Sequence, residues 1–193
     1  MGRNRLEAFS DGVLAIIITI MVLELKVPHE TSLAALQPLV PVLLSYVLSF
    51  LYIGIYWNNH HHMLHMVQKT TGTILWANLH LLFWLSLLPF VTGWTGENHF
   101  AAIPSALYGS VLLMAGFAYW ILQRCIIASQ GASSILQAAV GGDWKGNGSL
   151  VLYLIAIPIA LYQPVISNAI YALVALLWLI PDQRIERMLS KAE

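Results

Sequence analysis

The chain has 193 residues, of which 59% are hydrophobic and only 9% charged, and its nine basic and nine acidic residues cancel. A mean hydropathy of +0.73 excludes a soluble single domain of ordinary composition, and a net charge of zero argues against a nucleic-acid-binding surface. The composition therefore predicts an all-α integral membrane protein.

Six apolar windows are suited to crossing about 30 Å of hydrocarbon, although the last two are short. In chain order they are residues 9–25, 39–57, 74–94, 103–127, 150–163 and 165–180. The break at Gln163-Pro164 is either a tight hairpin or a kink in one long helix. The sequence predicts one membrane domain over residues 1–193, with six transmembrane helices.

The basic residues predict the orientation. With six spans and the N-terminus inside, only Lys26 lies outside, and the other basic residues are cytoplasmic: Arg3, Arg5, Lys69, Arg124, Lys145, Arg184, Arg187 and Lys191. No small-x-small cleavage site follows the first apolar run, so we expect an uncleaved span. These features predict a multi-pass cell-membrane protein with both termini in the cytoplasm.

The first span opens with a polar motif, Arg5-x-x-x-Phe9-Ser10-Asp11. From residue 12 to residue 23 the run is apolar except for Thr19. An aspartate at the middle of a spanning helix costs about 2.5–3.5 kcal/mol, and less towards the end. Asp11 is therefore expected to have a protein partner.

The same span has a distinct apolar face. At 100° per residue, Ile16, Ile20 and Leu23 share one side, Thr19 lies at its edge, and Asp11 lies well away from it. If several copies of the helix surround an axis, this side becomes rings of isoleucine and leucine with threonine hydroxyls between them. Because the motif occurs once, a channel needs several chains.

Polar side chains near the inner ends of the second and third spans share a depth with the motif. Because a polar group in hydrocarbon needs an internal partner, we predict that Arg5 and Asp11 are satisfied by some of Asn58, Asn59, His60, His61, Asn78 and His80. A metal site is an alternative, since His61 and His65 are four residues apart. The polar network or interfacial solvation is favoured, because a di-iron site needs several histidine-rich segments.

The motif and the isoleucine-rich run after it resemble the signature of the lysosomal potassium channels, the transmembrane protein 175 family, in its short prokaryotic form. The resemblance implies six spans per chain and a homotetramer whose first helices line the pore, without a TVGYG filter, which this sequence also lacks. It further implies a constriction at Ile16, additional apolar layers at Ile20 and Leu23, and a contribution of Thr19 to potassium preference.

The resemblance thus implies a potassium-selective cation channel with a hydrophobic gate, and not an enzyme. Its partners are then other copies of itself, the lipid bilayer and monovalent cations, with potassium as the permeant ion and no bound cofactor. Two other classes stay open from the residues. One is a proton-coupled transporter that uses Asp11 and the histidine cluster as a relay, and the other is a membrane enzyme with bound metal.

Overall fold

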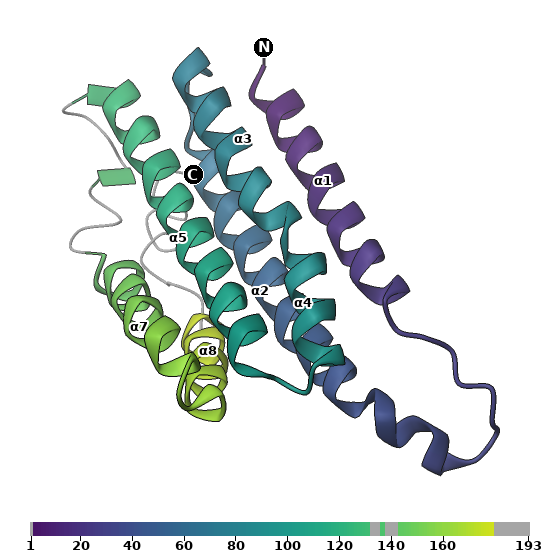
Figure 1. Cartoon of the computed structure of the whole chain (residues 1–193). Coiled ribbons are helices and arrows are strands. Elements are labelled where there is room, and N and C mark those ends of the chain that lie inside the picture. The colour runs from purple at the N-terminus through teal and green to yellow at the C-terminus, as the bar shows by residue number, and fades with distance from the viewer. Residues whose placement is uncertain (1, 132–135, 138–142, 180–193) are drawn as a thin grey trace.

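The computed structural model describes residues 2–131, 136–137 and 143–179, and the predicted all-α class is confirmed for them (Figure 1). With the labels of Figure 1, the helices are α1 (Arg3–Leu23), the 3-10 helix η1 (Leu33–Leu39), α2 (Val40–His65), α3 (Gly72–Ser86), α4 (Leu88–Glu97), α5 (Ala102–Gln130), α7 (Trp144–Ala160) and α8 (Pro164–Leu179).

Four helical stretches in the described part of the chain are long and apolar enough to cross a membrane. They cover Arg3–Leu23, Leu33–His65, Gly72–Glu97 and Ala102–Gln130. The two C-terminal helices are shorter, with 17 residues in α7 and 16 in α8, against the roughly 20 that span a typical bilayer. The arrangement as one six-span domain stays a prediction.

Several predicted span boundaries differ from the observed helices. The second helix continues to His65, so the polar cluster after Trp57 is helical. The third span is two helices that part at Leu87, with Pro89 in the first turn of α4. Proline lacks a backbone N–H and its ring crowds the preceding turn, which explains the break.

The break between the last two helices is a tight hairpin. Helix α7 ends at Ala160, α8 begins at Pro164, and the two helices pack against each other. The fifth helix starts at Trp144, earlier than predicted, because the Asp143 carboxylate accepts the Gly146 N–H at 3.0 Å and caps it. Residue 180 of the sixth predicted span and the basic residues Arg184, Arg187 and Lys191 lie outside the described residues.

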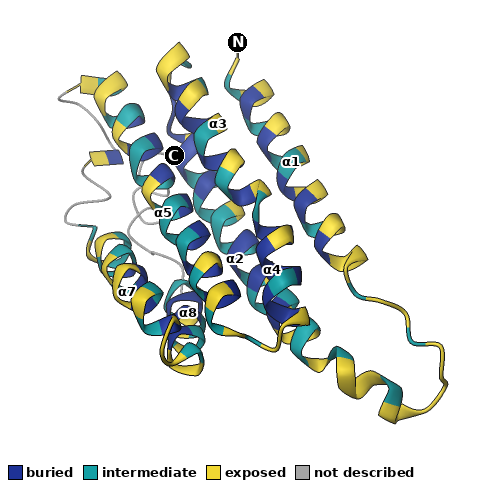
Figure 2. Cartoon of the chain, in the orientation of Figure 1, coloured by how far each residue is buried: buried dark blue, intermediate teal, exposed yellow. Residues whose placement is uncertain are grey.

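Helix α5 is central to the bundle, and it packs on α3, α4, α7 and α8. Helix α1 lies at one side and packs only one of its faces, against α2, α3 and α4 (Figures 1 and 2). The α7–α8 hairpin lies on the opposite side of α5 from α1. This arrangement leaves the second face of α1 without a neighbour within the described chain.

Hydroxyl groups tie the buried helices together. Ser49 on α2 hydrogen-bonds Thr92 on α4 at 2.6 Å and Tyr108 on α5 at 3.0 Å. The Tyr52 hydroxyl donates to the Tyr171 carbonyl oxygen on α8 at 2.7 Å. In hydrocarbon, such interhelical bonds help to fix packing that the hydrophobic effect does not specify.

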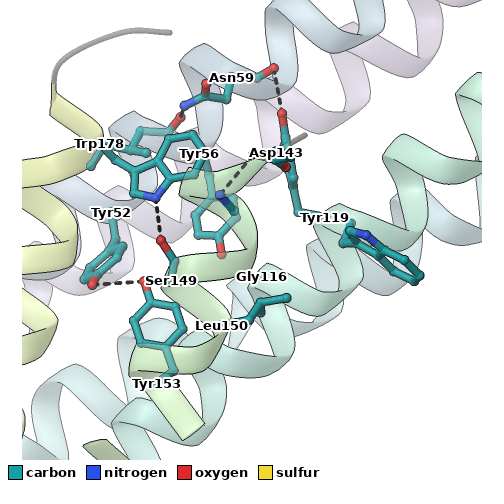
Figure 3. A pocket seen from close by; sticks show the side chains of 13 residues that line it. Tyr52, Tyr56, Asn59, Gly116, Tyr119, Asp143, Ser149, Leu150, Tyr153 and Trp178 are labelled. Carbon is teal, nitrogen blue, oxygen red and sulfur yellow. Dashed lines mark hydrogen bonds between the residues drawn. The ribbon is translucent and has the colours of Figure 1, made fainter. Parts of the chain in front are cut away.

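A small pocket lies where the α7–α8 hairpin meets α2 and α5 (Figure 3). Its walls are largely aromatic, and the bonds drawn in Figure 3 include Tyr153 to Tyr52 at 3.1 Å and Trp178 to Ser149 at 2.8 Å. The accessible volume is about 60 Å³, enough for a few water molecules at about 10–15 Å³ each. This pocket is separate from the exposed face of α1.

Candidate pore-lining face of α1

Helix α1 divides into a packed face and an exposed face. The packed residues are Leu6, Ser10, Leu14, Ile17 and Met21. The exposed side chains include Ile16 at 58%, Ile20 at 43% and Leu23 at 80% of their full accessible surface, with Gly12 and Thr19 also exposed on this helix. The three aliphatic positions predicted to form the pore stripe are therefore on the face that the described chain does not cover. Figure 2 shows exposed positions along α1 in yellow.

The Thr19 hydroxyl donates to the Ile16 carbonyl oxygen of the same helix at 2.8 Å. Because this bond uses the hydroxyl hydrogen, it leaves the oxygen lone pairs able to accept from water or to coordinate a cation. Thr19 is the only polar side chain between residues 12 and 23. Thr19 thus carries the one side-chain oxygen on this part of the exposed face that could coordinate a cation.

A buried chain of polar groups joins the motif to two other helices. Ser10 is fully buried, and its hydroxyl donates to the Leu6 carbonyl oxygen at 2.9 Å. The Asn78 amide nitrogen on α3 donates to the Ser10 oxygen at 3.0 Å, and the Asn78 oxygen lies 2.7 Å from His60 Nε2 on α2. Since the Asn78 oxygen is an acceptor, His60 carries its proton on Nε2 in this arrangement. The chain Ser10–Asn78–His60 links α1, α3 and α2.

A second contact holds α1 to α2 nearer the surface. The Trp57 indole N–H donates to Asp11 Oδ1 at 3.1 Å, and His61 Nδ1 lies 2.7 Å from Glu7 Oε1. The two acids are one helical turn apart on α1, and their partners are one turn apart on α2. The pairs Glu7–His61 and Asp11–Trp57 therefore form a two-rung ladder between the helices, which we call the acid ladder.

The acid ladder corrects the predicted partners of Asp11. The bond to Asp11 comes from Trp57, which was outside the six predicted side chains, while His61 pairs with Glu7. The matched spacing of four residues in Glu7/Asp11 and Trp57/His61 was the signal in the sequence that could have identified it. The indole ring of Trp57 is amphipathic: its apolar part can pack in the bundle while its N–H binds a polar partner.

The remaining predicted polar residues do not reach Asp11 or the Arg5 side chain. Asn59 donates to the Ile55 carbonyl oxygen of its own helix at 2.8 Å, and His80 accepts the Trp84 indole N–H of its own helix at 2.9 Å. The side chains of Arg5 and Asn58 make no hydrogen bond or ion pair among the described residues. The described chain therefore does not show the expected pairing of Arg5.

No contact was predicted from the sequence for two further residues at this end. Arg3 donates to the carbonyl oxygen of His65 at 2.9 Å, so this arginine, rather than Arg5, reaches across to the C-terminus of α2. Phe9 of the motif is half exposed.

Within the described ranges, no three His, Cys, Asp or Glu side chains gather closely enough to hold a metal ion.

The other end of α1 is held by an exposed contact. Lys26, just after α1, lies 2.6 Å from Glu97 at the end of α4. The hydrogen bond to Glu97 raises the pKa of Lys26 above its ordinary value, so the lysine stays charged at neutral pH. Exposed pairs of this kind contribute little to stability.

The chain is similar to known ion channels. The family described as "Endosomal/lysosomal potassium channel TMEM175" matches residues 5–89. A potassium channel from Chryseobacterium sp. (strain P1-3) is 55% identical over 191 residues, which cover 99% of this chain and 100% of that protein. The crystal structure of a lysosomal potassium-selective channel TMEM175 homolog from Chamaesiphon minutus matches with a TM-score of 0.81 at 26% identity, over 93% of this chain and 97% of that one.

A vertebrate protein with a different description also matches. The endosomal/lysosomal proton channel TMEM175 of Gallus gallus is 34% identical over 109 residues, which cover 50% of this chain but only 22% of that protein. The chain thus spans about a fifth of the vertebrate relative's length.

Replacing Asn78 with leucine should lower the stability of the folded protein by about 1–3 kcal/mol, because it leaves the Ser10 hydroxyl and the His60 ring buried with fewer partners. Thermal unfolding of the purified protein in detergent measures the effect. The matched control is Asn58→Leu, which removes no side-chain hydrogen bond of the described chain. Equal melting temperatures for the two variants would contradict a holding role for the Ser10–Asn78–His60 chain.

Proposed function

Because the chain belongs to the endosomal/lysosomal potassium channel TMEM175 family, we propose that it is a potassium-selective cation channel in which four copies surround a pore lined by α1. The family is one of ion channels rather than enzymes. The observation that carries the proposal is the exposed stripe of Ile16, Ile20 and Leu23 on a helix whose opposite face is packed into its own bundle.

The proposed gate is hydrophobic. Four Ile16 side chains around an axis would enclose a narrow apolar ring, and Ile20 and Leu23 would add two further layers. A constriction of this kind blocks ions because water leaves it and no polar group replaces the hydration shell. Opening must therefore widen the ring.

The Thr19 oxygens would supply the selective contacts. Between residues 12 and 23 no other side chain carries oxygen, and the bond from Thr19 to the Ile16 carbonyl orients the hydroxyl with its lone pairs free. A ring of such oxygens is able to replace part of the hydration shell of a potassium ion.

The channel would be oriented with the start of α1 in the cytoplasm. This end of the bundle carries Arg3, Arg5 and Lys69, as well as Arg124 near the end of α5, whereas Lys26 lies beyond the other end of α1 (Figure 1). By the positive-inside rule, the end richer in basic residues is cytoplasmic. We extend this orientation to six crossings of a cell membrane, with both termini on the cytoplasmic side.

Proton conduction is the second candidate function. It is favoured by the vertebrate relative described as a proton channel and by the titratable groups of the acid ladder. The His61 ring lies 5.6 Å from that of His62 and 6.2 Å from that of His65, so Glu7 contacts a row of imidazoles at the inner end of α1. Such a row also suits the relay of a proton-coupled transporter.

A planar bilayer with potassium on one side and sodium on the other separates these functions. A potassium-selective channel gives a stable reversal potential of the sign set by the potassium gradient, at equal pH on both sides. No current at equal pH, with a current or with saturating uptake when a pH gradient is applied, would refute the potassium channel and support the proton pathway.

Replacing Ile16 with asparagine should increase the ion flux by at least about tenfold, because amide groups keep water in the constriction and remove a barrier of the order of 1.4 kcal/mol or more. Single-channel recording measures the change. The control Ile16→Val keeps the ring apolar and should leave the pore mostly closed. Unchanged flux in the asparagine variant would count against Ile16 as the gate.

Replacing Thr19 with alanine should reduce the preference for potassium over sodium, because the ring then lacks side-chain oxygens. The shift of reversal potential in mixed potassium and sodium solutions measures the preference. Thr19→Ser retains the hydroxyl and should behave like the unmodified protein. If both variants keep the original permeability ratio, Thr19 has no part in selection.

A further inference from the structure

An open groove lies between the start of α3 and the last third of α5, away from the exposed face of α1. Its volume is about 440 Å³, within the range of sites that hold small molecules. The residues that matter for its chemistry are Thr71, Thr73, Trp120, Arg124, Cys125 and Ser129. No step of the proposed ion conduction uses them, and the inference rests on the proposed function only for the orientation of the bundle in the membrane.

The depth of the groove follows from the length of α5. The helix has 29 residues and is about 43 Å long at 1.5 Å per residue, so both ends extend beyond about 30 Å of hydrocarbon. Arg124 lies six residues before the end of this helix at Gln130, or about 9 Å from it. A centred α5 therefore places Arg124 close to the boundary between hydrocarbon and headgroups.

The Arg124 side chain is positioned but not neutralised. Its guanidinium carbon lies 5.3 Å from the centroid of the Trp120 ring, and Trp120 stacks on Phe117 at 5.8 Å between ring centroids. Arg124 is exposed, and no acidic side chain among the described residues pairs with it. The cation–π contact orients the guanidinium, and its N–H groups stay available for an anion.

The opposite wall adds hydrogen-bond donors. Thr71 caps α3 by accepting the Ile74 N–H at 3.3 Å, and its own hydroxyl hydrogen makes no further side-chain bond in the described chain. Thr73 is exposed in the first turn of α3, where backbone N–H groups and the helix dipole also favour negative charge. The groove therefore places a guanidinium and threonine hydroxyls on facing walls.

From this arrangement we propose that the groove binds an acidic glycerophospholipid. Arg124 and the hydroxyls of Thr71 and Thr73 contact the headgroup phosphate, and the acyl chain runs along the apolar wall formed by Trp120 and Ile121. The negative charge of this lipid complements the positive charge of Arg124. Anionic lipids also occur in the cytoplasmic leaflet, which this basic end of the bundle faces. A free phosphate ion has no part that uses the apolar wall.

Cys125 allows a direct test, because the chain's single cysteine lines this groove. The full-length protein is placed in nanodiscs of phosphatidylcholine alone or with 30% phosphatidylglycerol, and the rate of Cys125 modification by uncharged N-ethylmaleimide is measured. We expect the modification rate to fall about fivefold with phosphatidylglycerol. This factor corresponds to the contribution of one basic residue to binding at an anionic membrane surface. An uncharged reagent avoids enrichment or exclusion by the surface charge.

Arg124→Gln should abolish this protection, and Arg124→Lys should keep part of it as a point charge. Lys145→Gln is the matched control, since it removes one positive charge from α7, outside the groove, and should leave the protection intact. Native mass spectrometry of the same variants gives a second measurement: phosphatidylglycerol should stay bound to the original protein and to Lys145→Gln, but not to Arg124→Gln.

Four results would overturn the proposal. The first is an equal modification rate in both lipid compositions, and the second is full protection in Arg124→Gln. The third is a Cys125 that reacts in neither composition while no phosphatidylglycerol is retained, which would mean that protein, such as a neighbouring copy, covers the groove. Protection by inorganic phosphate in phosphatidylcholine nanodiscs would also contradict it, because it would show recognition of a soluble anion.

Discussion

The structure depends on one constraint, which is that polar groups inside hydrocarbon must be satisfied by the protein itself. The N-terminal half of α1 carries Glu7, Ser10 and Asp11, and each of them has a partner on α2 or α3. Ser10 is reached through buried Asn78, while the two acids are met at the surface by His61 and Trp57. These bonds determine which face of α1 turns inward, and they thereby leave Ile16, Ile20 and Leu23 uncovered.

The remaining helices hold α2 and α3, which in turn bind α1. Asn78 lies on α3, which packs against α5, and α2 is joined to α4, α5 and α8 through hydroxyl bonds of Ser49 and Tyr52. Gly109 on α5 permits the close contact with α8, because a Cβ atom there would lie 1.9 Å from the Tyr171 hydroxyl. The bundle therefore acts as a scaffold for one helix, in agreement with the single copy of the motif in the sequence.

The sequence was sufficient for features that depend on strong local signals. The hydropathy predicted the all-α membrane class, and the periodicity of α1 predicted that Ile16, Ile20 and Leu23 share a face. The hydrogen-bond partners of the motif were harder to predict from the sequence, because several polar residues share one depth and only tertiary packing selects among them. His60 and Asn78 do lie in a polar network, but His60 binds Asn78 and Asn78 binds Ser10, whereas Asp11 binds Trp57. The break at Leu87 is similar, since a proline near a helix end predicts a kink or a stop equally well.

The unequal anchoring of α1 bears on where a pore formed by this helix would be narrowest. The N-terminal end is held by the acid ladder and the Ser10 chain, while an exposed Lys26–Glu97 pair follows the C-terminal end. If α1 tilts about Asp11, displacement grows with distance along the helix, which is about 7.5 Å to Ile16 and about 18 Å to Leu23. The same tilt therefore moves Leu23 more than twice as far as Ile16. In an outward tilt the ring nearest the anchored end would open least, so Ile16 would limit the passage of such a pore, although Leu23 is equally apolar.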